Sequence, residues 1–141
     1  MEEGGVGKCW GFRLVNEKGE VVEESDVISL CEAGDRWVLV WWESPGQIWY
    51  GVKPESAALA YKRFWHERQK RSVEEWRRKC AKLQVELESA KRGGDLKKVE
   101  RAEGEYRYCL KWLEEEEEEL AMLDRLVEGL KKGSVKVELQ L

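Results

Sequence analysis

The chain has very little of several residue types that carry chemistry or mark membrane segments. Its 141 residues include no threonine, one asparagine, Asn16, and one histidine, His66. Its longest uncharged apolar run, Trp37 to Trp42, is far shorter than the roughly 20 residues that span a bilayer. The N-terminus has no basic stretch followed by an apolar one, which is the pattern of a secretory signal. We therefore expect no signal peptide, no contact with membranes and a cytoplasmic protein.

Motifs for catalysis or metal binding are also missing. His66 has no His-Glu-x-x-His partner, and the four cysteines show no C-x-x-C spacing, which removes the commonest zinc patterns. The segment from Gly4 to Lys8 has the glycines and lysine of a phosphate loop, but Cys9 follows where that motif needs Ser or Thr. The consecutive glutamates 114–119 point all round a helix and do not form a metal cage. We expect no enzyme, no catalytic residue, no cofactor and no metal.

Charge is abundant but unevenly distributed. The chain has 25 Lys and Arg against 29 Asp and Glu, a net charge of −4. Counting basic minus acidic residues gives 5 − 10 = −5 for 1–53, 10 − 6 = +4 for 54–91 and 10 − 13 = −3 for 92–141. The middle segment is therefore the only basic one. Richness in Glu, Lys and Arg with few thermolabile amides is typical of hyperthermophilic proteins.

The first half of the chain reads as strands separated by turns. Trp10, Phe12 and Leu14 alternate with polar or small residues, as in a half-buried strand. Turns rich in Gly, Pro and Asp are expected at 16–19, 33–35 and 44–46. The intervening segments 20–24, 27–32, 36–43 and 47–52 are predicted strands, the last two forming a hairpin.

The second half reads as two long helices. Pro54 suits a first helical position, Gly93-Gly94 ends the first helix, and Asp95 caps a second that runs to Lys132. Apolar residues recur at 3-4 spacing in both, with Glu116 the one exception. In the first helix they are Val73, Trp76, Cys80, Leu83, Leu87 and Ala90. In the second they are Val99, Ala102, Tyr106, Cys109, Leu113, Leu120, Leu123, Val127 and Leu130. This period predicts an antiparallel coiled-coil hairpin.

Folding about the Gly-Gly link brings residues whose numbers sum to about 186 side by side. The glutamate run 114–119 then faces 67–72, which contains Arg68, Lys70 and Arg71. Cys80 and Cys109 both lie in this seam, one turn out of register, so we expect two buried thiols rather than a disulfide. Cys9 and Cys31 could meet across the sheet, a point the sequence leaves open.

The chain ends in an alternating segment, 135–141, that reads as a strand. An antiparallel hairpin delivers this strand back to the N-terminal sheet. The sequence therefore predicts an α+β fold: a small antiparallel β-sheet base, a long antiparallel coiled-coil helical hairpin and a returning C-terminal strand. We expect one structural domain, with the sheet region at 1–53, the hairpin at 54–132 and the completing strand at 133–141.

Two apolar surfaces exceed what this fold needs. The strand 36–43 is apolar on both faces, whereas a half-exposed strand alternates with polar residues. The start of the first helix can cover one face. The second helix also carries apolar residues outside its seam. The candidate self-association or partner surface consists of Trp42, Trp49, Tyr108, Trp112, Met122 and Leu126.

Basic residues cluster near the middle of the predicted hairpin. The candidate basic stripe consists of Arg77, Arg78, Lys79, Lys82, Arg101, Arg107 and Lys111. Such a stripe could contact phosphates, although glutamates interleave with it. We therefore expect a non-enzymatic protein–protein interaction or scaffold module that forms a homodimer and uses the hairpin as its arm for a protein partner. The alternative is a nucleic-acid-binding protein that uses the basic stripe.

Overall fold

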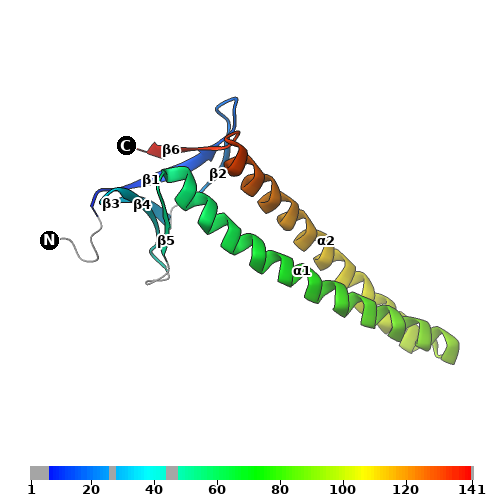
Figure 1. The fold of residues 1–141 in the computed structure, drawn as a ribbon. Helices are drawn as coiled ribbons and strands as arrows, with labels where there is room; N and C mark the ends of the chain where they lie inside the picture. Colours follow the sequence, from blue (N-terminus) through cyan, green and yellow to red (C-terminus); the bar gives the residue numbers. More distant parts are fainter. Residues whose placement is uncertain (1–6, 26–27, 44–47, 141) are drawn as a thin grey trace. The chain divides into compact units, whose positions relative to one another are not determined.

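The computed structural model describes residues 7–25, 28–43 and 48–140, and these form an α+β fold (Figure 1). In chain order the elements are β1 (Cys9–Val15), β2 (Val21–Glu24), β3 (Ile28–Ala33), β4 (Arg36–Trp41), β5 (Ile48–Gly51), α1 (Pro54–Gly93), α2 (Leu96–Lys132) and β6 (Lys136–Gln140). The chain divides into two compact units. The sheet unit is Met1–Trp65 with Asp124–Leu141, and the hairpin unit is His66–Leu123.

All strand pairs in the sheet unit are antiparallel. Arg13 in β1 lies opposite Glu24 in β2 and also opposite Glu138 in β6, so β2 and β6 flank β1 on its two edges. The first residues of β1 pair with β3, and β4 and β5 continue the sheet. The returning C-terminal strand is thus confirmed. The predicted turn at 44–46 lies outside the described residues.

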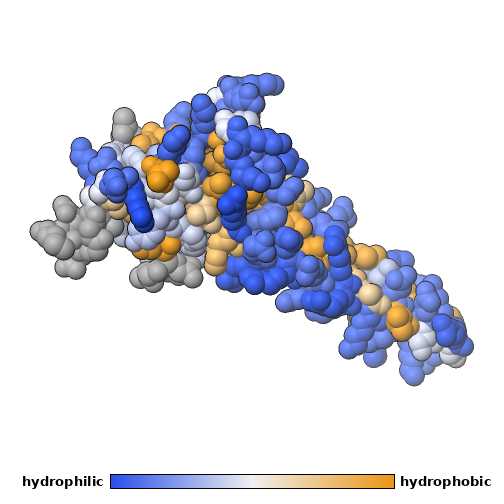
Figure 2. All heavy atoms as spheres, in the orientation of Figure 1, coloured by the Kyte–Doolittle hydropathy of each residue, from blue (hydrophilic) through white to orange (hydrophobic). Residues whose placement is uncertain are grey.

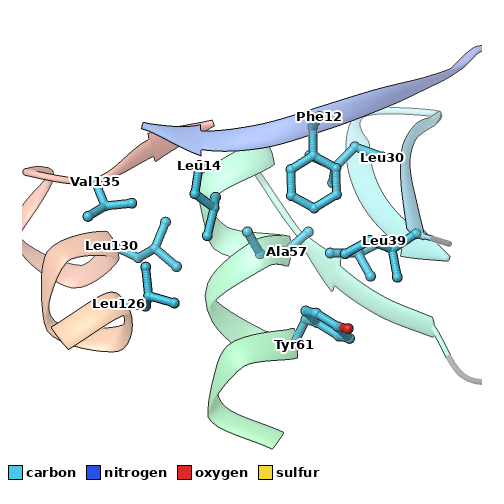
Figure 3. Packing of buried hydrophobic residues seen from close by; sticks show 11 residues of the cluster. Phe12, Leu14, Leu30, Leu39, Ala57, Tyr61, Leu126, Leu130 and Val135 are labelled. Carbon is cyan, nitrogen blue, oxygen red and sulfur yellow. The ribbon is translucent and has the colours of Figure 1, made fainter. Parts of the chain in front are cut away.

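The core of the sheet unit lies between one face of the sheet and the ends of the two helices (Figure 3). Phe12 and Leu14 point inward from β1 because strand residues two apart share a face. Leu30 and Leu39 are completely buried, and Ala57 of α1 is as well. The expected cover of the sheet by the start of α1 is therefore confirmed.

A buried ion pair links a helix to a strand within the same unit. The Lys62 ammonium, on α1, contacts the carboxylate of Glu23 in β2, and the lysine side chain is 8% exposed. Its Nζ also lies 5.3 Å from the ring centroid of Tyr61. A lysine is rarely buried without a partner, so the ion pair with Glu23 explains why Lys62 can be buried.

The helix ends follow the signals in the sequence. Gly94 has a φ of 74° and Gly133 a φ of 84°, a backbone region that glycine enters without strain. The Asp95 carboxylate accepts a hydrogen bond from the Lys97 backbone N–H at 3.1 Å, as an N-cap does. The predicted helix bounds are confirmed to within two residues.

The hairpin unit is closed by a narrow seam. Buried side chains come from Val73, Cys80 and Leu87 on α1 and from Cys109 and Leu123 on α2. The other predicted seam residues of this unit are half-buried.

Glu116, the exception to the apolar seam, is held by polar partners across the hairpin. The Gln69 amide donates to its backbone carbonyl at 2.9 Å and to its carboxylate at 3.0 Å. The Ser72 hydroxyl donates to the same carboxylate at 2.6 Å. The polar groups in the seam are therefore satisfied. The register expected from the Gly-Gly link is confirmed, because 69 and 116 sum to 185.

The cysteines differ from expectation. Cys80 and Cys109 form a disulfide across the seam, with Cα atoms 5.6 Å apart, so the prediction of two buried thiols was wrong. The numbers of the two cysteines sum to 189 rather than to the expected 186, a shift of less than one helical turn. At this pairing the Cα–Cα distance lies within the range that a disulfide spans. Cys9 and Cys31 lie directly opposite in β1 and β3 and form the second disulfide.

Candidate interaction surface

Three aromatic side chains gather on one side of the hairpin unit. Trp76 of α1 stacks with Trp112 of α2, with ring centroids 6.3 Å apart and planes 18° apart. Tyr108 meets Trp112 edge-on at 6.1 Å, and the Lys79 ammonium lies 4.8 Å from the Trp76 ring centroid. We call Trp76, Tyr108 and Trp112 the aromatic cluster. Its members come from two helices and depend on the hairpin register.

The aromatic cluster borders a shallow apolar groove of about 210 Å³. Besides Trp76 and Tyr108, its walls include Leu83 and the Cys109 end of the disulfide. Tyr108 remains 61% exposed and Trp112 40% exposed. In Figure 2, apolar residues lie between hydrophilic ones along the helical hairpin. Large aromatic side chains that stay exposed beside an apolar groove are typical of a contact surface.

The cluster arises because α2 presents apolar residues on more than one side. Cys109 and Leu113 face α1 and fill the seam. Tyr108 and Trp112 precede them by one residue each, which is about 100° around the helix. Within a two-helix hairpin no third helix covers that side.

The other predicted surface residues separate into different environments. Met122 is 43% exposed on α2. Leu126 is instead buried in the core of the sheet unit, because the end of α2 there packs with the sheet face. We therefore remove Leu126 from the candidate surface.

The two predicted surface tryptophans of the sheet unit also differ. Trp49 packs on the core, with its ring centroid 4.8 Å from that of Tyr61. Trp42 is 56% exposed, and its indole N–H donates to the Ser29 hydroxyl at 2.9 Å. On the sheet face away from the core, Tyr50 is 49% exposed. Of these two exposed residues, Trp42 belongs to the predicted surface and Tyr50 does not.

The candidate basic stripe does not form one face. Arg77 binds Glu117 at 2.8 Å on one side of the seam, whereas Lys79, two residues on, lies over Trp76. Two residues are about 200° apart on a helix, so these cations lie on opposite sides. Arg107 lies 3.7 Å from a glutamate one turn away. Four members form no ion pair with any residue in the described part of the chain: Arg78, Lys82, Arg101 and Lys111.

A lysine-lined cleft in the sheet unit escaped the sequence analysis. It has a volume of about 590 Å³ and lies where α1 begins and α2 ends. Its cations are Lys53, Lys131, Lys132 and Lys136, and Glu55 also lines it. The Glu55 carboxylate accepts a hydrogen bond from the Val137 backbone N–H at 2.9 Å. Lys53 is separated by more than 70 residues from the lysines at 131, 132 and 136, which is why no local motif signalled the cleft.

Further features of the described residues concern metals, membranes and titratable groups. Among them, no cluster of His, Cys, Asp or Glu could hold a metal ion, and no helix could cross a membrane. Burial raises the pKa of Tyr61, the polar indole N–H of Trp65 nearby lowers it, and the Glu23 carboxylate raises it. The phenol of Tyr61 is therefore held in its neutral form within the core of the sheet unit. Compared with models of known protein families, with curated proteins and with solved structures, the chain matches none.

Proposed function

We propose that this protein is a non-enzymatic protein–protein interaction module that self-associates, with the helical hairpin as its binding arm. The observation that carries the proposal is the exposed aromatic cluster beside its apolar groove. Trp and Tyr are the residue types most enriched among the side chains that dominate binding energy in interfaces. Burying Tyr108 and Trp112 against a partner would remove apolar surface from water at about 25 cal/mol per Å².

Light scattering on a sizing column tests this proposal, with two tyrosine variants compared. We expect the wild type to have twice its chain mass of 16.5 kDa. Tyr108→Ala should shift the protein toward the monomer, by at least about ten-fold in the dimer dissociation constant. Tyr50→Ala is the matched control, because this tyrosine is similarly exposed but belongs to the sheet unit.

Two results would contradict the proposal. A wild type that stays monomeric up to the highest soluble concentration would remove self-association. A dimer that dissociates with Tyr50→Ala and not with Tyr108→Ala would place the contact on the sheet rather than on the hairpin.

Nucleic-acid binding is the second candidate function, and the lysine-lined cleft favours it. The hairpin's basic residues support it less, because Arg77 and Lys79 lie on opposite sides. Phosphate contacts would make binding of an oligonucleotide weaken steeply between 50 and 200 mM salt. No shift in oligonucleotide mobility at the lower salt would eliminate this candidate.

A further inference from the structure

One side of α2 carries an ordered set of residues that the chain's own fold leaves exposed. At about 100° per residue, eight of them lie within roughly 40° of Tyr108 around the helix axis. We call them the outer stripe of α2: Lys97, Arg101, Gly104, Tyr108, Trp112, Glu115, Glu119 and Met122. Every one is exposed in the structure, and all belong to the hairpin unit. Trp112 also stacks on Trp76 of α1, and no third helix of the hairpin unit covers the stripe.

The stripe has opposite charge in its two halves. The residues toward the start of α2 are Lys97 and Arg101, and those toward its end are Glu115 and Glu119. None of the four forms an ion pair with another residue of the described chain. The aromatic residues Tyr108 and Trp112 lie between the two charged halves.

The charges are placed symmetrically about Tyr108. Arg101 and Glu115 are each seven residues from it, or about 10 Å along the axis. Lys97 and Glu119 are each eleven residues from it, about 16 Å. A second α2 laid antiparallel with Tyr108 opposite Tyr108 therefore meets opposite charge at all four positions. A parallel pair would set like charges beside each other, which is destabilising.

Gly104 gives independent support for the same arrangement. It lies inside α2, where glycine costs about 1 kcal/mol relative to alanine. A Cβ added at this position would meet nothing within 4 Å in the chain's own fold. Gly129, by contrast, lies against Val135 and has a packing reason within the chain. Gly104 and Trp112 are each four residues from Tyr108, so the antiparallel pair places each Gly104 opposite the indole of the other copy.

We propose that the partner of the aromatic cluster is a second copy of this chain, bound through an antiparallel α2–α2 contact with its two-fold axis at Tyr108. Arg101 then pairs with Glu115 of the second copy, Lys97 pairs with Glu119, and Trp112 fills the space above Gly104. This inference rests on the proposed self-association and adds its partner, its orientation and its register. Isologous contacts of this kind are the commonest form of protein dimer.

A charge-swap experiment tests the orientation, with dimer dissociation constants measured by analytical ultracentrifugation. Arg101→Glu should weaken the dimer about ten-fold, because the two-fold axis makes each change count twice. Glu115→Arg should weaken it similarly. The double variant Arg101→Glu with Glu115→Arg should return to within about three-fold of the wild type. Arg78→Glu makes the same charge change on an exposed residue of α1 and should have no such effect.

A glycine variant tests the register without endangering the fold. Gly104→Gln replaces glycine by a better helix former at an open position, so the chain should be at least as stable to denaturant. The added side chain would occupy the space of Trp112 from the second copy and should weaken the dimer at least about ten-fold. Ala121→Gln introduces the same side chain on an exposed residue of α2 that lies about 140° from Tyr108 around the helix axis, and it should leave the dimer intact.

The outcomes separate this inference from the proposed function. A wild-type dimer that is insensitive to Arg101→Glu and Gly104→Gln would overturn the antiparallel contact while leaving self-association standing. A dimer weakened by both charge variants but not restored by the double variant would also overturn the pairing. A monomeric wild type would remove the proposed function and this inference together.

Discussion

The sheet unit and the hairpin unit bury apolar residues in different ways. In the sheet unit, a sheet face and two helix ends enclose a cluster in which Leu30, Leu39 and Ala57 are inaccessible to solvent. In the hairpin unit, two helices meet along a single line, and Val73 and Cys109 are its most completely buried residues. Two helices alone enclose only a few side chains fully, and many of the seam residues stay half-buried. The hairpin therefore depends on a narrow seam, a disulfide and the Glu116 hydrogen bonds.

The comparison also explains where the exposed aromatic residues lie. The sheet unit covers Trp49 and Trp65 with its own helix and sheet. The hairpin unit has the residues of a third packing surface, Tyr108 and Trp112, but no third element within the unit to place on it. The exposure of these two aromatic residues is explained if a helix of a second chain packs on them.

Equal truncations in the two units give the largest expected contrast. Leu39→Ala should lower the free energy of unfolding by about 4 kcal/mol, because a fully enclosed site leaves a cavity. Leu87→Ala, in the seam, should cost only about 2 kcal/mol, because neighbouring side chains and water can fill the space. Urea unfolding followed by tryptophan fluorescence and circular dichroism measures both. An equal or larger loss for Leu87→Ala would refute the contrast between an enclosed core and an open seam.

The two disulfides sharpen the comparison, because their loops are similar in length. Cys9–Cys31 spans 22 residues and Cys80–Cys109 spans 29, so loop entropy alone predicts about 3.5 kcal/mol for each. Replacing either pair by alanine should therefore destabilise to a similar extent. In the Cys80→Ala, Cys109→Ala variant, limited proteolysis should nevertheless cut the hairpin unit before the sheet unit. The seam of the hairpin has few fully buried side chains, so without the disulfide it should open locally more often.

Mass spectrometry after alkylation without reductant provides the control for the disulfides. The wild type should take up no alkyl group, because all four cysteines are bonded. Two alkyl groups on Cys80 and Cys109 would show that the seam holds thiols and would restore the original expectation.

The parts of this fold that were predictable depend on local periodicity. The alternation of Trp10, Phe12 and Leu14 identifies a strand, and the 3-4 spacing with Gly93-Gly94 identifies the hairpin and its register. These signals lie within a few residues or a few turns of one another. They are therefore visible without knowing the rest of the chain.

The parts that were not predictable depend on contacts between distant segments. Leu126 lies outside the heptad seam, so only knowledge of the sheet beside that end of α2 shows that it is buried. The Lys62–Glu23 pair joins a helix residue to a strand residue about 40 positions earlier, and no local pattern indicates that the two lie close together. The Cys80–Cys109 bond depends on a shift of less than one helical turn, which is finer than a register inferred from a glycine link.

The smallest expected effect concerns the pH dependence of the sheet unit. Burial raises the pKa of Tyr61 above its value of 10.0 in the unfolded chain. Between these two pKa values the unfolded chain has lost the proton and the folded chain still holds it, so the free energy of unfolding falls as pH rises. The stabilisation is complete below about pH 10 and is lost as the pH rises toward the folded pKa. Urea unfolding at pH 8 and pH 10.5 should therefore show a larger loss for the wild type than for Tyr61→Phe, by less than about 1 kcal/mol. Tyr50→Phe changes an exposed phenol and is the control, so its free energy of unfolding should depend on pH as that of the wild type does. The same pH dependence for wild type and Tyr61→Phe would contradict a contribution of the buried phenol.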